Sequence, residues 1–197
     1  MRKLVYFVAA TVDGHIASPQ GEFDFFPLGE HFEAQVAELP GTIPAHLRAT
    51  VGAASEPRRF GAVVMGRKTY EVGARAGLTD PYAPLPTVVF SRTLATAESP
   101  VRVTAENPVD VVRALKRQPG RDIWLCGGGN LAASLADEID ELVVKLNPLL
   151  LGAGIALWSA PFAPRSLRLI NTRTFASGVV WLTYALSSRA SAPSPTS

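Results

Sequence analysis

The chain has 197 residues, of which 47% are hydrophobic and 18% charged, and this balance suits one compact domain. The formal net charge is only +2 and the basic residues are scattered, which argues against nucleic-acid binding. A single cysteine, Cys126, excludes an internal disulfide framework and a cysteine-rich zinc site, so a reducing, cytoplasmic location is predicted. No apolar run approaches the ~20 residues that a membrane-spanning helix needs.

In the first half of the chain, predicted strands alternate with helices. Residues 4–11 form a short apolar run that ends at Asp13-Gly14, which is typical of a buried strand closed by a turn. Residues 29–39 carry apolar side chains at helical spacing, namely Phe32, Val36 and Leu39, which predicts a helix with these residues on its apolar face. Residues 40–57 are rich in Pro, Gly and Ala and are expected to be irregular. The remaining elements predicted here are strands at 62–65, 87–91 and 101–104 and a helix at 68–72.

The second half continues the alternation and then changes character. Asn107 suits an N-cap and Pro108 the first position of a helix. Two long strands around Ser177-Gly178 read as a hairpin, and the Ser/Pro/Ala-rich tail 187–197 is predicted to be disordered. The other predicted elements are strands at 122–126 and 141–146, a helix at 131–137, and hairpin strands at 166–175 and 179–186. The pattern predicts an α/β domain over residues 1–186, with a mostly parallel central sheet and a C-terminal antiparallel hairpin.

Three glycines provide the strongest local signal for chemistry. Gly127, Gly128 and Gly129 follow a predicted buried strand, and a helix begins at Asn130 and Leu131. Glycines allow a ligand to approach the backbone closely, and the N–H groups that open a helix attract phosphate. The alternative is an ordinary tight turn, because the segment is neither GxGxxG nor a Walker motif.

Two further strand ends carry cations and hydroxyls. Gly66, Arg67, Lys68 and Thr69 place two cations in the first turn of a helix, where they oppose the helix dipole unless an anion binds there. Ser91-Arg92 follows the next strand, and Arg92 could hold the 2′-phosphate that distinguishes NADP from NAD. Solvated basic turns are the alternative reading of both. Ligands of open α/β sheets bind along the carboxyl edge of the strands, so the three turns together indicate a dinucleotide.

The end of the first strand is the candidate catalytic region. Asp13 could orient a substrate or supply a proton, although Asp13-Gly14 alone is read more readily as a turn. Asp24 lies among aromatic residues that could wall a pocket for a planar ring or simply pin the loop to the core. His15, His31 and His46 show no metal-ligand spacing, so no metal site is predicted.

The ordered set of motifs resembles a known family. It comprises Asp13-Gly14-x-Ile16-Ala17, Met65-Gly66-Arg67-Lys68-Thr69-Tyr70-Glu71, Phe90-Ser91-Arg92 and Gly127-Gly128-Gly129-x-Leu131. The set is similar to the dihydrofolate-reductase-like domain at the C-terminus of bifunctional riboflavin-biosynthesis enzymes, which also occurs as stand-alone proteins. The resemblance implies a three-layer dihydrofolate-reductase-like fold, NADPH at the carboxyl edge of the sheet, a small-molecule substrate and a homodimer.

The resemblance also implies residue roles. It maps the residues that face the substrate and the nicotinamide to Thr11, Asp13, Gly14 and Ile16. The residues themselves make Asp13 the candidate catalytic group, with water as the alternative source of the proton, and Asp24 a candidate for substrate binding. The implied cofactor contacts are Gly66, Arg67, Lys68, Thr69, Ser91, Arg92, Gly127, Gly128, Gly129, Asn130 and Leu131. The chain departs from the riboflavin reductases in having Thr11 where they usually carry serine, and it lacks the zinc motif of their companion deaminase.

Three hypotheses follow for the function. The first is NADPH-dependent hydride transfer to a C=N or C=O bond of a small heterocyclic substrate. The second is a non-catalytic NADPH-binding module, because folate reductases place a carboxylate on the first helix and Glu30, Glu33 and Glu38 are candidates only by position. The third is reduction of a ribosylaminopyrimidine, which predicts a basic pocket for the substrate phosphate that nothing outside the cofactor motifs supplies.

Overall fold

The computed structural model describes residues 1–94 and 100–186. Its strands are β1 (Leu4–Thr11), β2 (His15–Ala17), β3 (Phe60–Gly66), β4 (Thr87–Phe90), β5 (Arg102–Thr104), β6 (Asp122–Gly127), β7 (Glu141–Asn147), β8 (Ile155–Ala156), β9 (Leu167–Thr174) and β10 (Val180–Leu186). Its helices are α1 (Glu30–Glu38), the 3-10 helix η1 (Pro40–Thr42), α2 (Ala45–Val51), α3 (Arg67–Arg75), α4 (Pro108–Arg117) and α5 (Gly129–Ser134).

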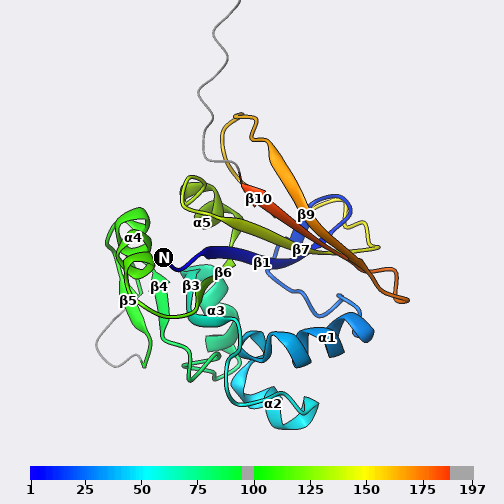
Figure 1. Ribbon diagram of the computed structural model, residues 1–197, viewed down its shortest axis with the longest axis horizontal. Helices are drawn as coiled ribbons and strands as arrows, with labels where there is room; N and C mark the ends of the chain where they lie inside the picture. The colour runs from blue at the N-terminus through cyan, green and yellow to red at the C-terminus, as the bar shows by residue number, and fades with distance from the viewer. Residues whose placement is uncertain (95–99, 187–197) are drawn as a thin grey trace, which may run out of the picture.

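One large sheet organises the described part of the chain (Figure 1). The strand order is β5-β4-β3-β6-β1-β7-β10-β9, and neighbours from β5 to β7 are parallel. β10 and β9 are antiparallel and form the predicted hairpin at one edge. The predicted α/β class, mostly parallel with a C-terminal hairpin, is therefore confirmed.

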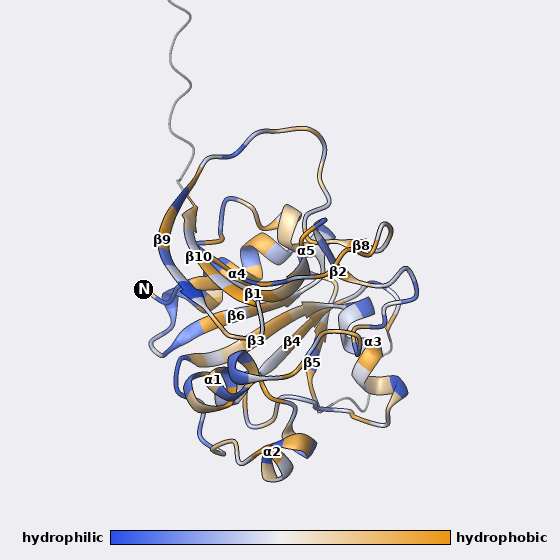
Figure 2. Cartoon of the chain, turned by 90° about the vertical axis from the view of Figure 1, so that its right-hand side faces the viewer, coloured by the Kyte–Doolittle hydropathy of each residue, from blue (hydrophilic) through white to orange (hydrophobic). Residues whose placement is uncertain are grey.

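Helices cover both faces of this sheet and bury two apolar clusters. On one face, Leu39 at the end of α1 and Tyr70 of α3 join the strand side chains of β1, β3 and β6. On the other, α4 and α5 pack over the same strands through Val112 and Leu135. Figure 2 shows the hydrophobic strands enclosed between the two helical layers. The burial of each large apolar side chain contributes ~1.5–3 kcal/mol, which makes these two clusters the main source of stability.

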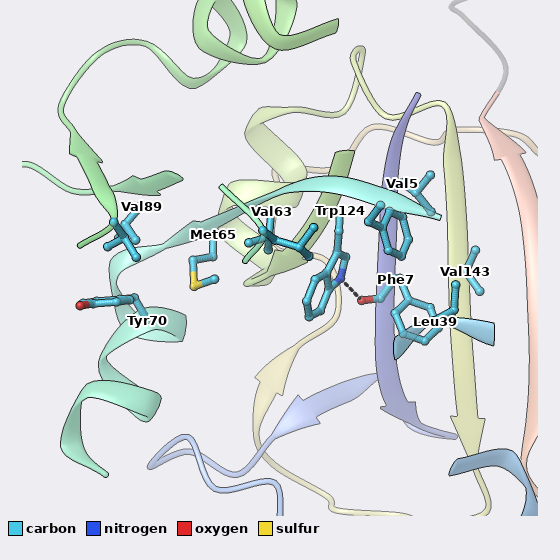
Figure 3. Close-up of a cluster of buried hydrophobic side chains, with 12 residues drawn as sticks. Val5, Phe7, Leu39, Val63, Met65, Tyr70, Val89, Trp124 and Val143 are labelled. Carbon is cyan, nitrogen blue, oxygen red and sulfur yellow. Dashed lines mark hydrogen bonds between the residues drawn. The ribbon is translucent and has the colours of Figure 1, made fainter. Parts of the chain in front are cut away.

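Trp124 of β6 is the centre of the first cluster (Figure 3). Its indole Nε1 donates to the carbonyl oxygen of Phe7 on β1 at 3.0 Å. Its ring lies 4.7 Å from that of Tyr82, edge to face. Because the polar atom of the indole is satisfied by the neighbouring strand, the large ring can be buried without an unpaired donor.

Sequence patterns located most elements to within a few residues. The Asn107 cap is confirmed, since its side chain accepts from the Val109 amide and Pro108 begins α4. The expectation that 40–57 is irregular is wrong, because η1 and α2 lie there. α2 ends at Val51 and is capped by Gly52, which adopts φ +68°, a conformation that favours glycine. The small sheet of β2 and β8 was not predicted, because two short strands 140 residues apart leave no periodic signal.

The predicted helix at 131–137 begins earlier than expected. α5 starts at Gly129, directly after the glycine turn, and ends at Ser134. No helix within the described residues is long and apolar enough to cross a membrane. The predicted disordered tail, 187–197, lies outside the described residues.

Candidate functional site

The three predicted phosphate turns lie side by side at the carboxyl edge of the sheet. β3 runs parallel between β4 and β6, so the ends of all three strands point the same way. Gly66 on β3 is level with Phe90 on β4, and Met65 is level with Gly127 on β6. Three segments separated by more than 20 residues in the sequence thus form one continuous ledge.

Thr69 joins two of these turns. A Cβ placed on Gly127 would lie 3.6 Å from the Thr69 hydroxyl oxygen, and one placed on Gly128 would lie 3.8 Å from it. The bare backbone of the two glycines therefore leaves a recess beside the hydroxyl, of a kind that side chains would fill. Gly127 also adopts φ +142°, which other residues rarely accept. The recess and its N–H and O–H donors suit a phosphate oxygen.

The cations of this edge differ in their present contacts. Arg67 donates to the Glu71 carboxylate one helical turn on, at 2.6 Å, and its side chain is 40% exposed. Lys68 and Arg92 are exposed. The Ser91 hydroxyl accepts from the backbone amides of Thr93 and Leu94, so it holds the turn that presents Arg92.

A cavity of about 390 Å³ lies beside Arg92, between the ends of β4 and β5 and the start of α4. Glu106 also lines it, with its carboxylate bound by the Thr104 hydroxyl and by Arg102. These donors lower the pKa of Glu106, so the carboxylate is ionised at neutral pH. Arg92 would favour a 2′-phosphate here, whereas Glu106 would favour the hydroxyls of an unphosphorylated ribose.

Two residues at the glycine turn pack against the rest of the protein. A Cβ on Gly129 would lie 2.3 Å from the carbonyl oxygen of Ala156 on β8, so only glycine fits. Leu131 packs against the second apolar cluster, while Asn130 is exposed. Gly129 and Leu131 therefore position the turn, and the open backbone belongs to Gly127 and Gly128.

The end of β1 is a tight polar turn. The Thr11 hydroxyl is buried, donates to the Asp13 carboxylate at 2.5 Å and accepts from the His15 amide. Asp13 also accepts from the backbone amides of Leu151 and Gly152, at 3.0 and 2.7 Å. This turn therefore ties the end of β1 to the loop that follows β7.

These contacts bear on the predicted role of Asp13. The Thr11 hydroxyl and the Gly152 amide hold the pKa of Asp13 well below its ordinary value, so the group is ionised. An ionised carboxylate with so low a pKa is a poor proton donor. Gly14 and Ile16 lie in the same turn and on β2, and Asp24 is exposed on the following loop. The substrate contacts of Gly14, Ile16 and Asp24 stay predictions.

With this geometry in place, the chain can be compared with known proteins. A family model described as the RibD C-terminal domain matches residues 2–181. The chain belongs to the RibD C-terminal domain family. The predicted resemblance to this domain is thereby confirmed.

Two uncharacterized proteins of Bacillus subtilis (strain 168) are similar to this RibD C-terminal domain chain. YyaP is 37% identical over 98 residues, which cover 49% of this chain and 52% of YyaP, so the match spans about half of that relative. YwjB is 27% identical over 181 residues, covering 90% of this chain and 95% of YwjB.

Solved structures share the fold. A Shewanella sp. PV-4 protein named for riboflavin biosynthesis has a TM-score of 0.67 at 24% identity, covering 95% of this chain and 99% of that one. A Thermotoga maritima diaminohydroxyphosphoribosylaminopyrimidine deaminase/5-amino-6-(5-phosphoribosylamino)uracil reductase has a TM-score of 0.63 at 16% identity, and the match covers 94% of this chain and 57% of that one. At these identities the likeness shows the dihydrofolate-reductase-like fold alone.

The first helix presents polar groups to the sheet that the sequence pattern missed. Phe32 and Val36 were expected to form its buried face, but His31, Ala34 and Gln35 are the buried residues.

The three glutamates of α1 are not among the buried residues. Glu30 accepts from the Ala176 amide, Glu33 is exposed, and Glu38 binds Arg173 at 2.5 Å. Among the described residues of α1, the group that reaches the sheet is an amide, Gln35, and its partner is Lys145.

Lys145 lies on β7, level with Ala9 on β1, and its ammonium donates to Gln35 Oε1 at 2.5 Å. Burial lowers the pKa of Lys145 to about 8. Burial also raises the pKa of Cys126, on the same face of β6, to about 12, so the thiol stays protonated and is no nucleophile. A lone lysine on a strand carries no motif, and only the pairing of β7 with β1 places it here.

A second cavity, of about 470 Å³, lies near the end of α1, away from the phosphate turns. Three arginines line it. Arg173 binds Glu38, and Arg59 binds Glu141 and Asp122, whereas Arg58 donates to the backbone carbonyl of Ala37. The carboxyl edge is the better candidate for the cofactor, because the three predicted turns meet there and Lys68 and Arg92 are exposed beside them. Among the described residues, no cluster of three or more His, Cys, Asp or Glu side chains could hold a metal ion.

Proposed function

We propose that this protein is an NADPH-dependent reductase that transfers hydride to a C=N or C=O bond of a small heterocyclic substrate. The observation that carries the proposal is the convergence of Gly66–Thr69, Ser91–Arg92 and Gly127–Gly128 on one sheet edge. Membership of a family of reductase domains supports it. A cytoplasmic location stays a prediction.

Each group at this edge has a separate task when the cofactor binds. Reduced nicotinamide supplies the hydride. Thr69 and the Gly127–Gly128 backbone would hold the pyrophosphate, and Arg67 would neutralise it after leaving Glu71. Arg92 would bind the 2′-phosphate in the cavity beside β5. These clamps would hold the phosphate groups of the cofactor at the carboxyl ends of β3, β4 and β6.

The test is a thermal-shift titration with NADPH and NADH side by side, followed by a substrate screen. A ligand at 100 times its Kd adds ~2.7 kcal/mol of stability, which such a titration detects. The proposal expects a shift with NADPH and loss of reduced-nicotinamide absorbance with a pterin, a flavin precursor or a small carbonyl compound. A shift without turnover would favour the NADPH-binding module. No shift with either nucleotide would overturn the cofactor site.

We also propose that the protein is a homodimer joined through β9. β9 is the edge strand of the large sheet, and all eight of its residues are exposed. Three of them are large and apolar: Leu167, Leu169 and Ile170 are 42%, 51% and 48% exposed. An open edge of this kind invites another strand, and a second copy offers a self-complementary one. Leu169→Lys should convert the dimer to a monomer in analytical ultracentrifugation, whereas a monomeric wild type would overturn the proposal.

A further inference from the structure

Lys145 is a half-buried ammonium group between α1 and the sheet. It lies on β7 between Ala9 of β1 and Trp181 of β10, which are its register partners. Its nitrogen lies 5.0 Å from the centre of the Phe7 ring, and Gln35 closes over it from α1. The ion pairs among the described residues give it no carboxylate. Keeping a cation in such surroundings costs free energy of folding. Groups of this kind cluster at functional sites, which indicates a functional role for Lys145.

Gln35 is held so that its oxygen faces the lysine. Its amide nitrogen donates to the Thr42 hydroxyl at 2.8 Å, and that hydroxyl donates to the Leu39 carbonyl at 2.7 Å. Both Gln35 and Thr42 are buried. With the nitrogen engaged, only Oε1 is left for Lys145, so the network points one N–H of the ammonium at Gln35. An ammonium has three N–H donors, and the other two are available to a ligand.

Resting on the proposed function, we propose that Lys145, positioned by Gln35, binds the substrate heteroatom next to the reducible carbon and gives it the proton that completes reduction. Lys145 is the catalytic residue of this pair and Gln35 the positioning residue. Because an ammonium only donates hydrogen bonds, the substrate must present a carbonyl oxygen or an imine nitrogen. A carboxylate at this place would instead select a substrate that presents N–H donors.

The reduction of an imine substrate needs only the hydride and this one proton. The substrate carbon receives a hydride from the reduced nicotinamide and forms a new C–H bond. The π electron pair of the C=N bond moves to nitrogen, which takes a proton from Lys145 Nζ. The lysine is left as a neutral amine and is reprotonated from solvent. For a carbonyl substrate, oxygen takes the place of nitrogen and the product is an alcohol.

The surroundings of Lys145 make proton release possible near neutral pH. Burial lowers its pKa to about 8, while the neighbouring thiol of Cys126 opposes that shift weakly. His31 on α1 interacts electrostatically with Lys145. Burial and the charge of Lys145 both lower the pKa of His31. Tyr82, packed beside Cys126, has a pKa raised far above its ordinary value and stays protonated.

The first experiment needs no substrate. Competitive labelling with acetic anhydride near neutral pH, read by peptide mass spectrometry, compares Lys145 with Lys3, Lys68 and Lys116 in the intact protein. The free-amine fraction at neutral pH rises as the pKa of a lysine falls. Lys145, whose pKa is lowered to about 8, should therefore label several-fold faster than Lys3, whose pKa is raised. Labelling of Lys145 no faster than Lys3 would overturn the proposal, because a proton donor must be both reachable and easily deprotonated.

Gln35→Glu is the matched variant for that experiment. It keeps the size of the side chain but places a carboxylate 2.5 Å from the ammonium, which should raise the pKa of Lys145 and slow its labelling. Unchanged labelling would show that Gln35 does not control the lysine. Thermal shift with NADPH should be the same in both proteins, so failure here is distinct from failure of the cofactor site.

The second experiment uses a substrate found in the screen. Wild-type kcat should fall as pH rises through the pKa of Lys145, and Gln35→Glu should move that fall to higher pH. Lys145→Met should lower kcat ~100-fold or more with a smaller change in KM, and should abolish the pH dependence. Lys3→Met, which removes a lysine bound to Glu141 outside the site, is the control. Lys145→Met with wild-type kcat would overturn the proposal.

Discussion

Two regions of the molecule differ in how far their cations are exposed to solvent. One is the carboxyl edge of β3, β4 and β6, and the other is the α1-facing side of β1 and β7. At the edge, Arg67, Lys68 and Arg92 stand in or near solvent beside a bare glycine backbone. Under α1, Lys145 is enclosed between Phe7 and Gln35. Exposed cations keep full charge and suit a permanent anion, whereas an enclosed ammonium has a lowered pKa and suits proton transfer.

The two regions also differ in what holds them. The edge depends on close backbone packing, above all at Gly129 and between β2 and β8. The α1-facing side depends on side-chain hydrogen bonds that run from Leu39 through Thr42 and Gln35 to Lys145. Steric changes should therefore damage the first region most, and charge changes the second.

The largest expected effect is a loss of stability caused by disrupting the backbone packing at the carboxyl edge. Gly129→Ala would place a Cβ 2.3 Å from the Ala156 carbonyl, where only a backbone shift can relieve the clash. We expect a loss of ~3 kcal/mol in the free energy of unfolding, measured by urea denaturation. Gly66→Ala is the control, since its nearest neighbour would be 3.8 Å away, and it should cost much less. Equal losses would contradict the packing argument.

The next prediction tests the enclosed charge through stability. The folded protein binds fewer protons than the unfolded chain between about pH 8 and 10.5, the folded and ordinary pKa values of Lys145. Its contribution therefore makes stability rise with pH across that window. Lys145→Met removes the titrating group and so lacks this rise. The unfolding free energy of the variant minus that of the wild type should therefore fall from pH 7 to pH 10.5. A constant difference would show that the lysine is not desolvated.

A third prediction concerns the cofactor preference of the edge. Arg92→Ala should weaken NADPH binding ~10-fold while changing NADH binding much less, because only NADPH carries the 2′-phosphate. Glu106→Gln removes the carboxylate from the same cavity and should shift the preference further toward NADPH. Isothermal titration with both nucleotides measures these changes. Equal losses for both nucleotides in Arg92→Ala would remove Arg92 from that role.

A fourth prediction addresses the turn at the end of β1. Asp13→Asn removes the charge that Thr11, Leu151 and Gly152 stabilise, so stability at neutral pH should fall. The pKa of Asp13 is depressed in the fold, so its contribution is present above the ordinary pKa of 3.8 and is lost as pH falls. Variant and wild type should therefore converge in acid unfolding. Loss of turnover beyond that of stability would restore the predicted catalytic role of Asp13.

The smallest expected effect is a change in NADPH affinity when the ion pair of Arg67 is removed. Glu71→Gln removes its ion-pair partner one helical turn away. Exposed pairs of this kind contribute ~0.3–0.5 kcal/mol, so releasing Arg67 should tighten NADPH binding about two-fold. Weaker binding in the variant would mean that Glu71 positions Arg67 for the cofactor instead of competing with it.

Local chemistry made the edge of the sheet predictable. A buried strand, a glycine or basic turn and a helix start are encoded within a few consecutive residues, as at Met65–Thr69. Parallel order then brings such turns to one edge. The Asn107–Pro108 helix start was predictable for the same reason, since a cap is a contact between neighbours in the chain.

The α1-facing side was not predictable, because its partners are far apart in the sequence. Gln35 and Lys145 are 110 residues apart, and the spacing of apolar residues pointed to Phe32 and Val36 as the buried face of α1. Helical periodicity finds the apolar stripe, but it does not reveal a polar side chain that is buried because a distant strand supplies its partner.

The sequence by itself thus determined the α/β class, the family and the positions of the three turns at the carboxyl edge, since each depends on residues close together in the chain. Only the tertiary structure decided that Asp13 is tied into a turn, that Gly129 is fixed by β8, and that Lys145 meets Gln35. The physical reason is that burial and charge stabilisation depend on which strands pair and in which register, and these follow from the packing of the whole sheet.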